Sequence, residues 1–144
     1  MSVNQISIFL ENKPGTLHEM TQVLDESRVD MRALSLAETE GFGIVRIIVN
    51  DVDEAVNVLR NAGYVCRMVP VVIVSIPNEP GGLNTVLSYL KDAGVNLDYM
   101  YAMEGGRIAD HALMIFRVSD AAKAERVLKA RNIRIVNQAD IAEE

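Results

Sequence analysis

The sequence has little of what a secreted or membrane-spanning protein needs. Its 144 residues include one cysteine, Cys66, so no internal disulfide can form, which agrees with a reducing cytoplasm. No segment approaches the roughly 18 uninterrupted apolar residues of a membrane span. The first five residues contain no basic segment that leads into an apolar one, so we expect no secretory signal. We therefore predict a cytoplasmic protein without a membrane partner.

For nucleic-acid binding, the basic residues are too scattered and the aromatic residues are too few. The chain has 14 basic and 20 acidic residues, a net charge of −6, and its lysines and arginines form no stripe. Aromatic residues make up 5% and tryptophan is absent, which leaves no platform on which bases could stack. Nucleic acid is therefore not an expected partner.

The residue types of catalytic and metal sites do not converge in the sequence. No grouping of serine, histidine and carboxylate suggests acyl transfer. His18 and His111 are far apart and share no metal-ligand spacing with Cys66, which we interpret as a small core residue. We predict no catalytic residue, no metal and no cofactor.

What the sequence does contain is a repeat. Asn12-Lys13-Pro14-Gly15-Thr16-Leu17 returns as Asn78-Glu79-Pro80-Gly81-Gly82-Leu83, and 78 − 12 gives an interval of 66 residues, close to half of the 144. Each copy follows an alternating apolar run and opens an amphipathic one, so the repeated unit is strand, turn, helix. A repeat of this length indicates two copies of one small module.

The two halves give the same order of elements. Apolar periods of two and 3.6 residues predict strand, helix, strand, strand, helix, strand in each half. The ranges are 6–10, 17–26, 29–36, 44–49, 55–62 and 64–69, then 72–76, 83–93, 97–103, 112–118, 124–128 and 133–136. Asp51 or Asp53, and Asp120, are expected to cap the second helix of their halves. The second half is longer by three residues, which we assign to a hairpin at 104–110.

Each half is therefore β-α-β-β-α-β, the ferredoxin-like arrangement in which a four-stranded antiparallel sheet carries two helices on one face. The predicted fold class is α+β, with a first module at 1–70 and a second at 71–144. Pro70 separates them without a flexible linker, and a module of about 70 residues is small for independent stability. We expect a rigid pseudo-dimer of modules, followed by a solvated acidic end at 139–144.

A unit of this size and order resembles the ACT domain. The resemblance is carried by Asn-x-Pro-Gly-x-Leu between the first strand and first helix, and by Gly94-Val95-Asn96-Leu97 leading into a second strand. It covers both halves and leaves only a short tail, 137–144. ACT domains are sensing modules, most often for amino acids, that usually regulate a neighbouring catalytic domain. The resemblance implies a stand-alone tandem ACT protein that binds an amino acid, lacks catalysis and acts on a separate enzyme.

The chemistry of the repeated turn also suits a small ligand with a carboxylate. A helix start presents free backbone N–H groups and the positive end of the helix dipole. Glycine lets a ligand approach the main chain closely, and proline costs no hydrogen bond at this position. The candidate ligand-binding residues of the turns are Asn12, Pro14, Gly15, Thr16 and Leu17 in the first copy, and Asn78, Pro80, Gly81, Gly82 and Leu83 in the second.

In ACT domains the asparagine of this loop often works with a polar residue at the start of the second strand. The resemblance assigns that role to Asp30 for Asn12, and to Asn96 for Asn78. A carboxylate at Asp30 would pair with an ammonium group but repel a ligand carboxylate, so we expect two unequal sites, the second the more typical. The alternative is structural: Asn12 and Asn78 cap the helices and bind no ligand.

Three functions follow from these patterns. The first is an amino-acid-binding regulatory protein of amino-acid metabolism, a homodimer that acts through a partner enzyme. The second is a ligand-free structural or regulatory subunit of an amino-acid biosynthetic enzyme, resembling the small chains of branched-chain amino-acid synthases. The third is an enzyme on the ferredoxin-like scaffold. The sequence does not support it, because no acid, base or nucleophile is seen to come together at one site. Binding of an amino acid separates the first function from the second.

Overall fold

The computed structural model describes residues 3–103 and 111–142. The chain divides into two compact units at Val69 and Pro70, within one strand. We call Asn4–Val69 the first module and Pro70–Ala142 the second module; Val3 groups with the second.

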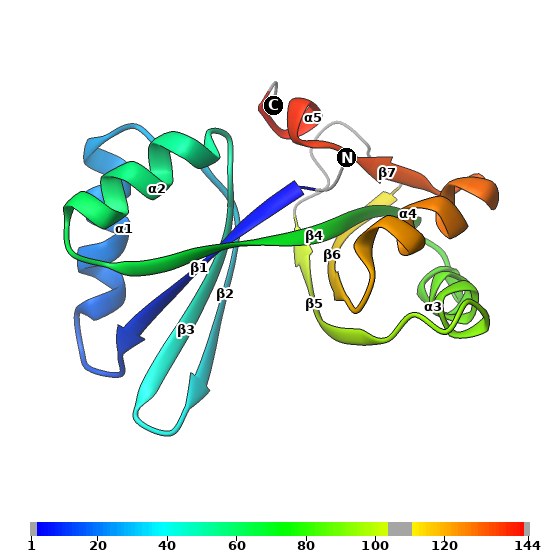
Figure 1. Cartoon of the computed structure of the whole chain (residues 1–144), viewed down its shortest axis with the longest axis horizontal. Coiled ribbons are helices and arrows are strands. Elements are labelled where there is room, and N and C mark those ends of the chain that lie inside the picture. Colours follow the sequence, from blue (N-terminus) through cyan, green and yellow to red (C-terminus); the bar gives the residue numbers. More distant parts are fainter. Residues whose placement is uncertain (1–2, 104–110, 143–144) are drawn as a thin grey trace. The chain divides into compact units, whose positions relative to one another are not determined.

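The first module follows the predicted order of elements (Figure 1). Its helices and strands are β1 (Val3–Glu11), α1 (Thr16–Glu26), β2 (Met31–Thr39), β3 (Phe42–Val49), α2 (Val52–Asn61) and the first part of β4 (Val65–Pro77). β3 lies between β1 and β2 and is antiparallel to both, and β4 lies on the other side of β1.

The second module repeats this order from the second part of β4 onward. It continues with α3 (Gly82–Asp92), β5 (Leu97–Met103), β6 (His111–Val118), α4 (Ala121–Ala130), β7 (Arg134–Val136) and α5 (Gln138–Ala142). β6 lies between β4 and β5 and is antiparallel to both, and β7 pairs with the other side of β4. The prediction of two tandem ferredoxin-like modules is confirmed.

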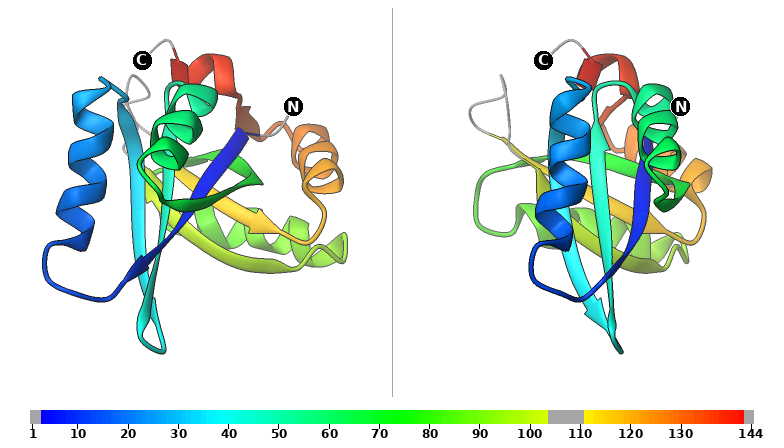
Figure 2. Two further views of the ribbon diagram at one scale, coloured as in Figure 1. Left: turned by 60° about the vertical axis from the view of Figure 1, so that its left-hand side comes forward. Right: turned by 90° about the vertical axis from the view of Figure 1, so that its left-hand side faces the viewer.

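One face of each sheet is covered by the two helices of its module. In the first module, Ile6 and Ile8 of β1 are fully buried with Met20 of α1 and Leu59 of α2, and Figure 2 shows both helices on this side. In the second module the core is of the same kind, and its largest buried members are Leu90, Phe116 and Leu128. Burial of alternate strand residues against an apolar helix stripe is the main driving force for each module. Cys66 belongs to the first core, as expected.

The second helix of each module begins with an aspartate cap. The Asp51 carboxylate accepts a hydrogen bond from the Glu54 N–H at 3.1 Å, and the Asp120 carboxylate accepts one from the Lys123 N–H at 3.0 Å. Each carboxylate satisfies one of the free N–H groups of the first turn. The predicted caps are confirmed, with Asp51 rather than Asp53 in the first module.

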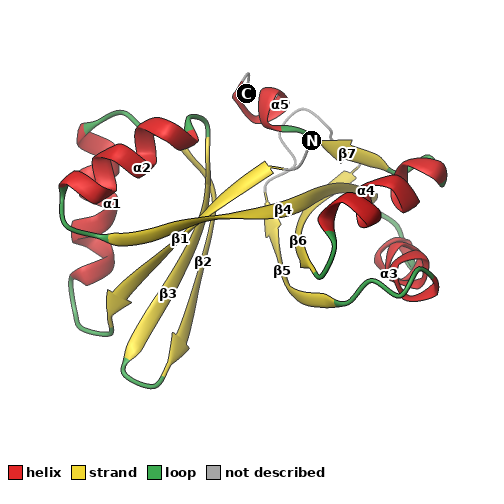
Figure 3. Ribbon diagram, in the orientation of Figure 1, coloured by secondary structure: helices red, strands yellow, loops and turns green. Residues whose placement is uncertain are grey.

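The structure differs from the sequence-based expectation at the module boundary and at the C-terminal end. β4 passes through Pro70 as one uninterrupted strand, as Figure 3 shows, because the φ angle of proline is compatible with extended backbone. The expected solvated acidic end is wrong in part: Gln138–Ala142 form helix α5, and its Ile141 is 1% exposed. Asn137 and Asp140 each accept a hydrogen bond from the other's backbone N–H, which fixes the start of α5.

Two other expectations concern a hairpin and membrane-spanning segments. The hairpin assigned to 104–110 lies outside the residues that the structure describes. Within residues 3–103 and 111–142, no helix is both long and apolar enough to cross a lipid bilayer.

Candidate functional site

The first Asn-x-Pro-Gly turn joins the end of β1 to the start of α1 with a fixed hydrogen-bond pattern. The Lys13 N–H donates to the Glu11 carbonyl at 3.0 Å, and the Thr16 N–H donates to the Lys13 carbonyl at 3.3 Å. Gly15 is the N-cap, with φ at +90°, and its carbonyl accepts from the Glu19 N–H at 3.0 Å. A residue with a Cβ atom is strained at this φ angle, so the turn requires glycine.

The second turn has the same backbone pattern. The Glu79 N–H donates to the Pro77 carbonyl at 2.9 Å, and the Gly82 N–H donates to the Glu79 carbonyl at 3.1 Å. Gly81 is the N-cap, with φ at +84°, and its carbonyl accepts from the Thr85 N–H at 3.0 Å. The sequence repeat is therefore a repeat of local structure.

The two asparagines do not cap the helices, so the capping expected in the structural alternative is wrong. The N-caps are the two glycines, and neither helix has a side-chain cap. Asn12 and Asn78 come three residues before the N-cap, and both are exposed. Their side chains form no hydrogen bond with the described residues, so both amides are available to a ligand.

Each turn leaves two backbone N–H groups free at the start of its helix. Within residues 3–103 and 111–142, no acceptor is found for the N–H groups of Leu17 and His18 in α1, or of Leu83 and Asn84 in α3. Neighbouring N–H groups at the positive end of a helix dipole are suited to an anion such as a carboxylate. The exposed asparagine of each turn adds a donor and an acceptor.

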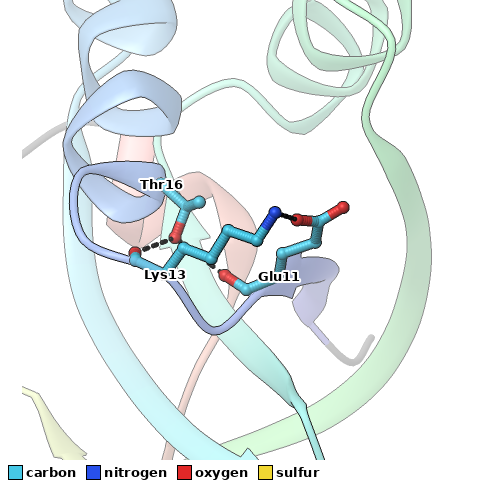
Figure 4. A network of polar contacts seen from close by, with 3 residues as sticks. All are labelled: Glu11, Lys13 and Thr16. Carbon is cyan, nitrogen blue, oxygen red and sulfur yellow. Dashed lines mark hydrogen bonds and ion pairs between the residues drawn. The ribbon is translucent and has the colours of Figure 1, made fainter.

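The side chains around the two turns differ. In the first turn, the Thr16 hydroxyl donates to the carbonyls of Glu11 at 2.9 Å and of Lys13 at 3.0 Å (Figure 4). The Lys13 ammonium lies 2.7 Å from the Glu11 carboxylate. Figure 4 marks this ion pair with a dashed line. In the second turn Gly82 takes the place of Thr16, and Pro77 and Glu79 take the places of Glu11 and Lys13. The second turn therefore lacks the hydroxyl bonds of Thr16, and among the described residues its Glu79 carboxylate has no basic partner.

The ion pair of the first turn gives a prediction about pH. The hydrogen bond between Lys13 and Glu11, and then the attraction between their opposite charges, lower the pKa of the Glu11 carboxyl and raise the pKa of the Lys13 ammonium. Because the pKa of Glu11 is lowered on folding, its small contribution to stability is present above the ordinary carboxyl pKa and is lost as pH falls through the lowered value. Titration followed by NMR is expected to show a higher Glu11 pKa in the variant Lys13→Gln, whereas Lys91→Gln leaves it unchanged. An unchanged Glu11 pKa in Lys13→Gln would contradict the ion pair.

A cavity of about 370 Å³ lies beside the first turn. The residues that line it include Glu11, Thr16, Glu19 and Tyr64. Burial, and then the charge of Glu19, raise the pKa of the Tyr64 hydroxyl. Two acidic residues thus line this cavity, and the carboxylate of one of them, Glu11, pairs with Lys13.

Asp30 and Asn96 precede the second strand of their modules and are held by equivalent backbone contacts. The Asp30 N–H donates to the Asn50 side chain at 3.1 Å, and the Asn50 N–H donates back to the Asp30 carbonyl at 3.2 Å. In the second module, the Asn96 N–H donates to the Ser119 hydroxyl at 3.0 Å, and the Ser119 N–H donates to the Asn96 carbonyl at 2.9 Å. Both positions are exposed. Their backbone is fixed while their side chains face solvent.

Within one module, the loop asparagine and the strand-start residue lie at opposite ends of the sheet. Glu11, next to Asn12, pairs with Phe42 at the beginning of β3, whereas Met31, next to Asp30, pairs with Val49 at its end. Seven residues of strand span about 23 Å. The second module has the same register, because Pro77 pairs with His111 and Leu97 pairs with Val118. A small ligand therefore cannot contact the asparagine loop and the strand start of the same module at once.

Sequence reasoning missed the side chains that contact Asp30 and Asn96. Arg32 lies with its Nε 3.2 Å from a carboxylate oxygen of Asp30, an ion pair whose alignment is too poor for a hydrogen bond. In the second module the Asn96 amide donates to the Asp98 carboxylate at 2.9 Å. Both Arg32 and Asp98 lie at a register shift of their strands, where a β-bulge redirects a side chain. At the interval of 66 residues, Arg32 corresponds to Asp98, so the charge at this position is reversed between the two halves. This reversal is the signal in the sequence that points to both residues.

No group of three or more histidine, cysteine, aspartate or glutamate side chains in the described ranges could hold a metal ion. The groups present at the turns are therefore donors and acceptors for a small polar molecule: free helix N–H groups and exposed amides. This geometry is suited to binding.

Comparison with known proteins identifies what the chain resembles. A model of the ACT domain pair family matches residues 1–144. Protein BT0572 from Bacteroides thetaiotaomicron is 37% identical, with a TM-score of 0.92 over 100% of this chain and 98% of that one. No curated protein matches the sequence.

Two regulatory subunits of aspartate kinase share the fold at lower identity. The subunit from Thermus thermophilus, in its ligand-free form, is 16% identical, with a TM-score of 0.68 over 91% of this chain and 92% of that one. The subunit from Thermus flavus is 15% identical, with a TM-score of 0.63 over 90% and 92%.

Proposed function

This chain belongs to the ACT domain pair family, and we propose that it is a non-catalytic regulatory protein that binds an amino acid at its two Asn-x-Pro-Gly turns. The observation that carries this proposal is the same in both modules: two free N–H groups at a helix start next to an exposed asparagine amide. The fold shared with regulatory subunits of aspartate kinase supports a role in amino-acid metabolism.

The proposed ligand contacts follow from the charges of an amino acid. The ligand carboxylate accepts hydrogen bonds from the free N–H groups of Leu17 and His18, or of Leu83 and Asn84, at the positive helix end. The ligand ammonium donates to the asparagine carbonyl oxygen of the turn and to a strand-start residue, Asp30 or Asn96. Because loop and strand start lie far apart within a module, we propose that a second copy of the chain completes the site. The protein is then a homodimer with shared ligand sites.

Regulation requires that the ligand bind two states of the protein with different affinity. A ligand that bridges two copies binds the dimer more tightly than the separate chains, because its site is complete only in the dimer. We propose that this change acts on a separate enzyme of amino-acid metabolism in the cytoplasm, which recognises one state of the dimer.

Calorimetry and thermal unfolding against the common amino acids test this proposal. At least one amino acid is expected to bind and to raise the unfolding temperature, because a ligand at about 100 times its Kd stabilises the folded state by about 2.7 kcal/mol. The ligand-free subunit predicted as the alternative would give neither heat nor a shift in unfolding temperature. That outcome with every amino acid would refute the proposed function.

A further inference from the structure

Helix α4 of the second module, orange in Figure 1, carries a row of basic residues on its solvent side. Lys123, Arg126 and Lys129 recur every three residues; the last two are exposed and Lys123 is half-buried. At 3.6 residues per turn these three positions lie within roughly 120° of one another, on the side opposite the buried Ala124 and Leu128. We call Lys123, Arg126 and Lys129 the basic face.

The charges of the basic face have no acidic partner among the described residues. The ion pairs found there join other side chains, and Glu125, the acidic residue of α4, lies roughly 100° around the helix from Arg126. The remaining exposed residues of α4 are alanines. Just beyond the helix, Arg131 adds a further positive charge, with its guanidinium 4.8 Å from the centroid of the Tyr89 ring. A chain with a net charge of −6 therefore has a locally positive surface here.

The corresponding helix of the first module has no such face. α2 and α4 align at an interval of 69 residues, and Glu54, Asn57 and Arg60 take the places of the three residues of the basic face, in that order. α2 contains two acidic residues and one basic residue, a net charge of −1, whereas α4 contains three basic residues and one acidic residue, a net charge of +2. The fold that the two modules share therefore does not require the basic face.

Helix stability does not account for the basic face either. The helix dipole favours negative charge in the first turn and positive charge in the last. α2 follows this rule, with Asp53 and Glu54 in its first turn and Arg60 in its last. The first turn of α4 contains Lys123 and no acidic residue, apart from the cap Asp120 that precedes it. A charge pattern that breaks a local rule without a structural gain indicates a functional surface.

We propose that the basic face binds an acidic segment of a partner protein, the enzyme that this chain regulates; for the existence of that enzyme the inference rests on the proposed function. From Lys123 to Lys129 the face spans about 9 Å, which suits carboxylates that recur about one helical turn apart. Between them, the Arg126 guanidinium can hold one carboxylate by two hydrogen bonds. Opposite charges steer the two surfaces together and fix their orientation.

Nucleic acid is a poorer fit to this surface than an acidic protein segment. The net charge of −6 repels a phosphate backbone over the rest of the chain. α4 contains no aromatic residue on which a base could stack. A short acidic segment, by contrast, needs only the few positive charges that the basic face presents.

Fluorescence anisotropy of a fluorescein-labelled peptide of twelve glutamates, with the full chain and without amino acid, tests the proposal. The wild type is expected to bind the peptide, with a Kd that rises as NaCl is raised from about 50 to about 500 mM, because salt screens exposed charges. Arg126→Glu with Lys129→Glu is expected to raise the Kd at least tenfold, since two attractions become two repulsions. Arg60→Glu with Lys91→Glu, at exposed positions of α2 and α3, changes the net charge equally and is expected to leave the Kd within about threefold.

Transfer of the basic face to the first module is the second test. Glu54→Lys with Asn57→Arg, together with the existing Arg60, gives α2 basic residues at the same three positions, and both changed positions are exposed. This variant is expected to raise the stoichiometry from one peptide to two per chain. Circular dichroism checks that each variant is folded.

The proposal is overturned if Arg126→Glu with Lys129→Glu binds the peptide as the wild type does. It is also overturned if a labelled oligonucleotide of twelve thymidines binds the basic face more tightly than the peptide, which would identify a nucleic acid as the partner. Calorimetry measures amino-acid binding separately and is expected to give the same result for the wild type and this double variant. A chain that binds the peptide but no amino acid would refute the proposed function alone.

Discussion

Replacement of Gly82 by alanine is expected to lower the free energy of unfolding of the second module by about 1–3 kcal/mol. A Cβ atom at this position would lie 2.5 Å from the carbonyl oxygen of Pro77 and 3.2 Å from a methyl group of Ile76. The first distance is too short for any stable contact, and the oxygen belongs to the backbone, so strand end and helix start must move apart. The same substitution at an unhindered helix position would stabilise the protein by about 0.5–1 kcal/mol.

Urea unfolding followed by far-ultraviolet circular dichroism measures this effect. Asn84→Ala, two residues further along the same helix and exposed, is the matched control and is expected to change the stability by less than about 0.5 kcal/mol. A Gly82→Ala variant as stable as the wild type would show that the close approach of α3 to β4 is relaxed in solution.

This contact also explains why the two turns differ in sequence. In the first module, Thr16 occupies the position of Gly82, and its hydroxyl donates to the carbonyl of Glu11, which corresponds to that of Pro77. A hydrogen bond thus joins helix and strand end in the first module, where direct backbone packing joins them in the second. The difference between Thr16 and Gly82 can be read from the sequence. The short distance to the Pro77 carbonyl oxygen, which makes glycine necessary in the second module, depends on the packing of α3 against β4.

The elements of the fold could be predicted because local patterns and tertiary packing agree. The second strand of the second module was expected at 97–103, and β5 is Leu97–Met103. Asp51 and Asp120 cap their helices because an aspartate next to an amphipathic run has the first-turn N–H groups within reach. Consistency between local preference and global fold is typical of sequences that specify one structure.

The candidate site could be predicted only in part. Asn12 and Asn78 stand out in the sequence, but their freedom from capping depends on the positive φ angles of Gly15 and Gly81, which make glycine the N-cap. The separation of Asn12 from Asp30 depends on strand register, which is a relation between β1, β2 and β3 and is not contained in any one segment. The burial of Ile141 likewise depends on tertiary contacts that an acidic tail does not reveal.

Replacement of Asn78 by alanine is expected to weaken amino-acid binding at the second turn by about 10- to 100-fold. A hydrogen bond to a charged group contributes about 1.5–3 kcal/mol, and tenfold in Kd corresponds to about 1.4 kcal/mol. The side chain is exposed and makes no hydrogen bond with the described residues, so its loss leaves the folded chain with its stability nearly unchanged. Asn12→Ala is expected to have the same effect at the first turn.

Calorimetry distinguishes the two sites by stoichiometry. If both turns bind in the wild type, each single variant loses one site per chain within the accessible concentration range, and the double variant loses both. Asn57→Ala, on an exposed position of α2, is the matched control and is expected to bind like the wild type. Because loss of the amide removes a ligand contact and no capping interaction, the unfolding temperature without ligand stays the same while the shift caused by ligand is reduced. Full-affinity binding to the double variant would place the ligand away from the Asn-x-Pro-Gly turns.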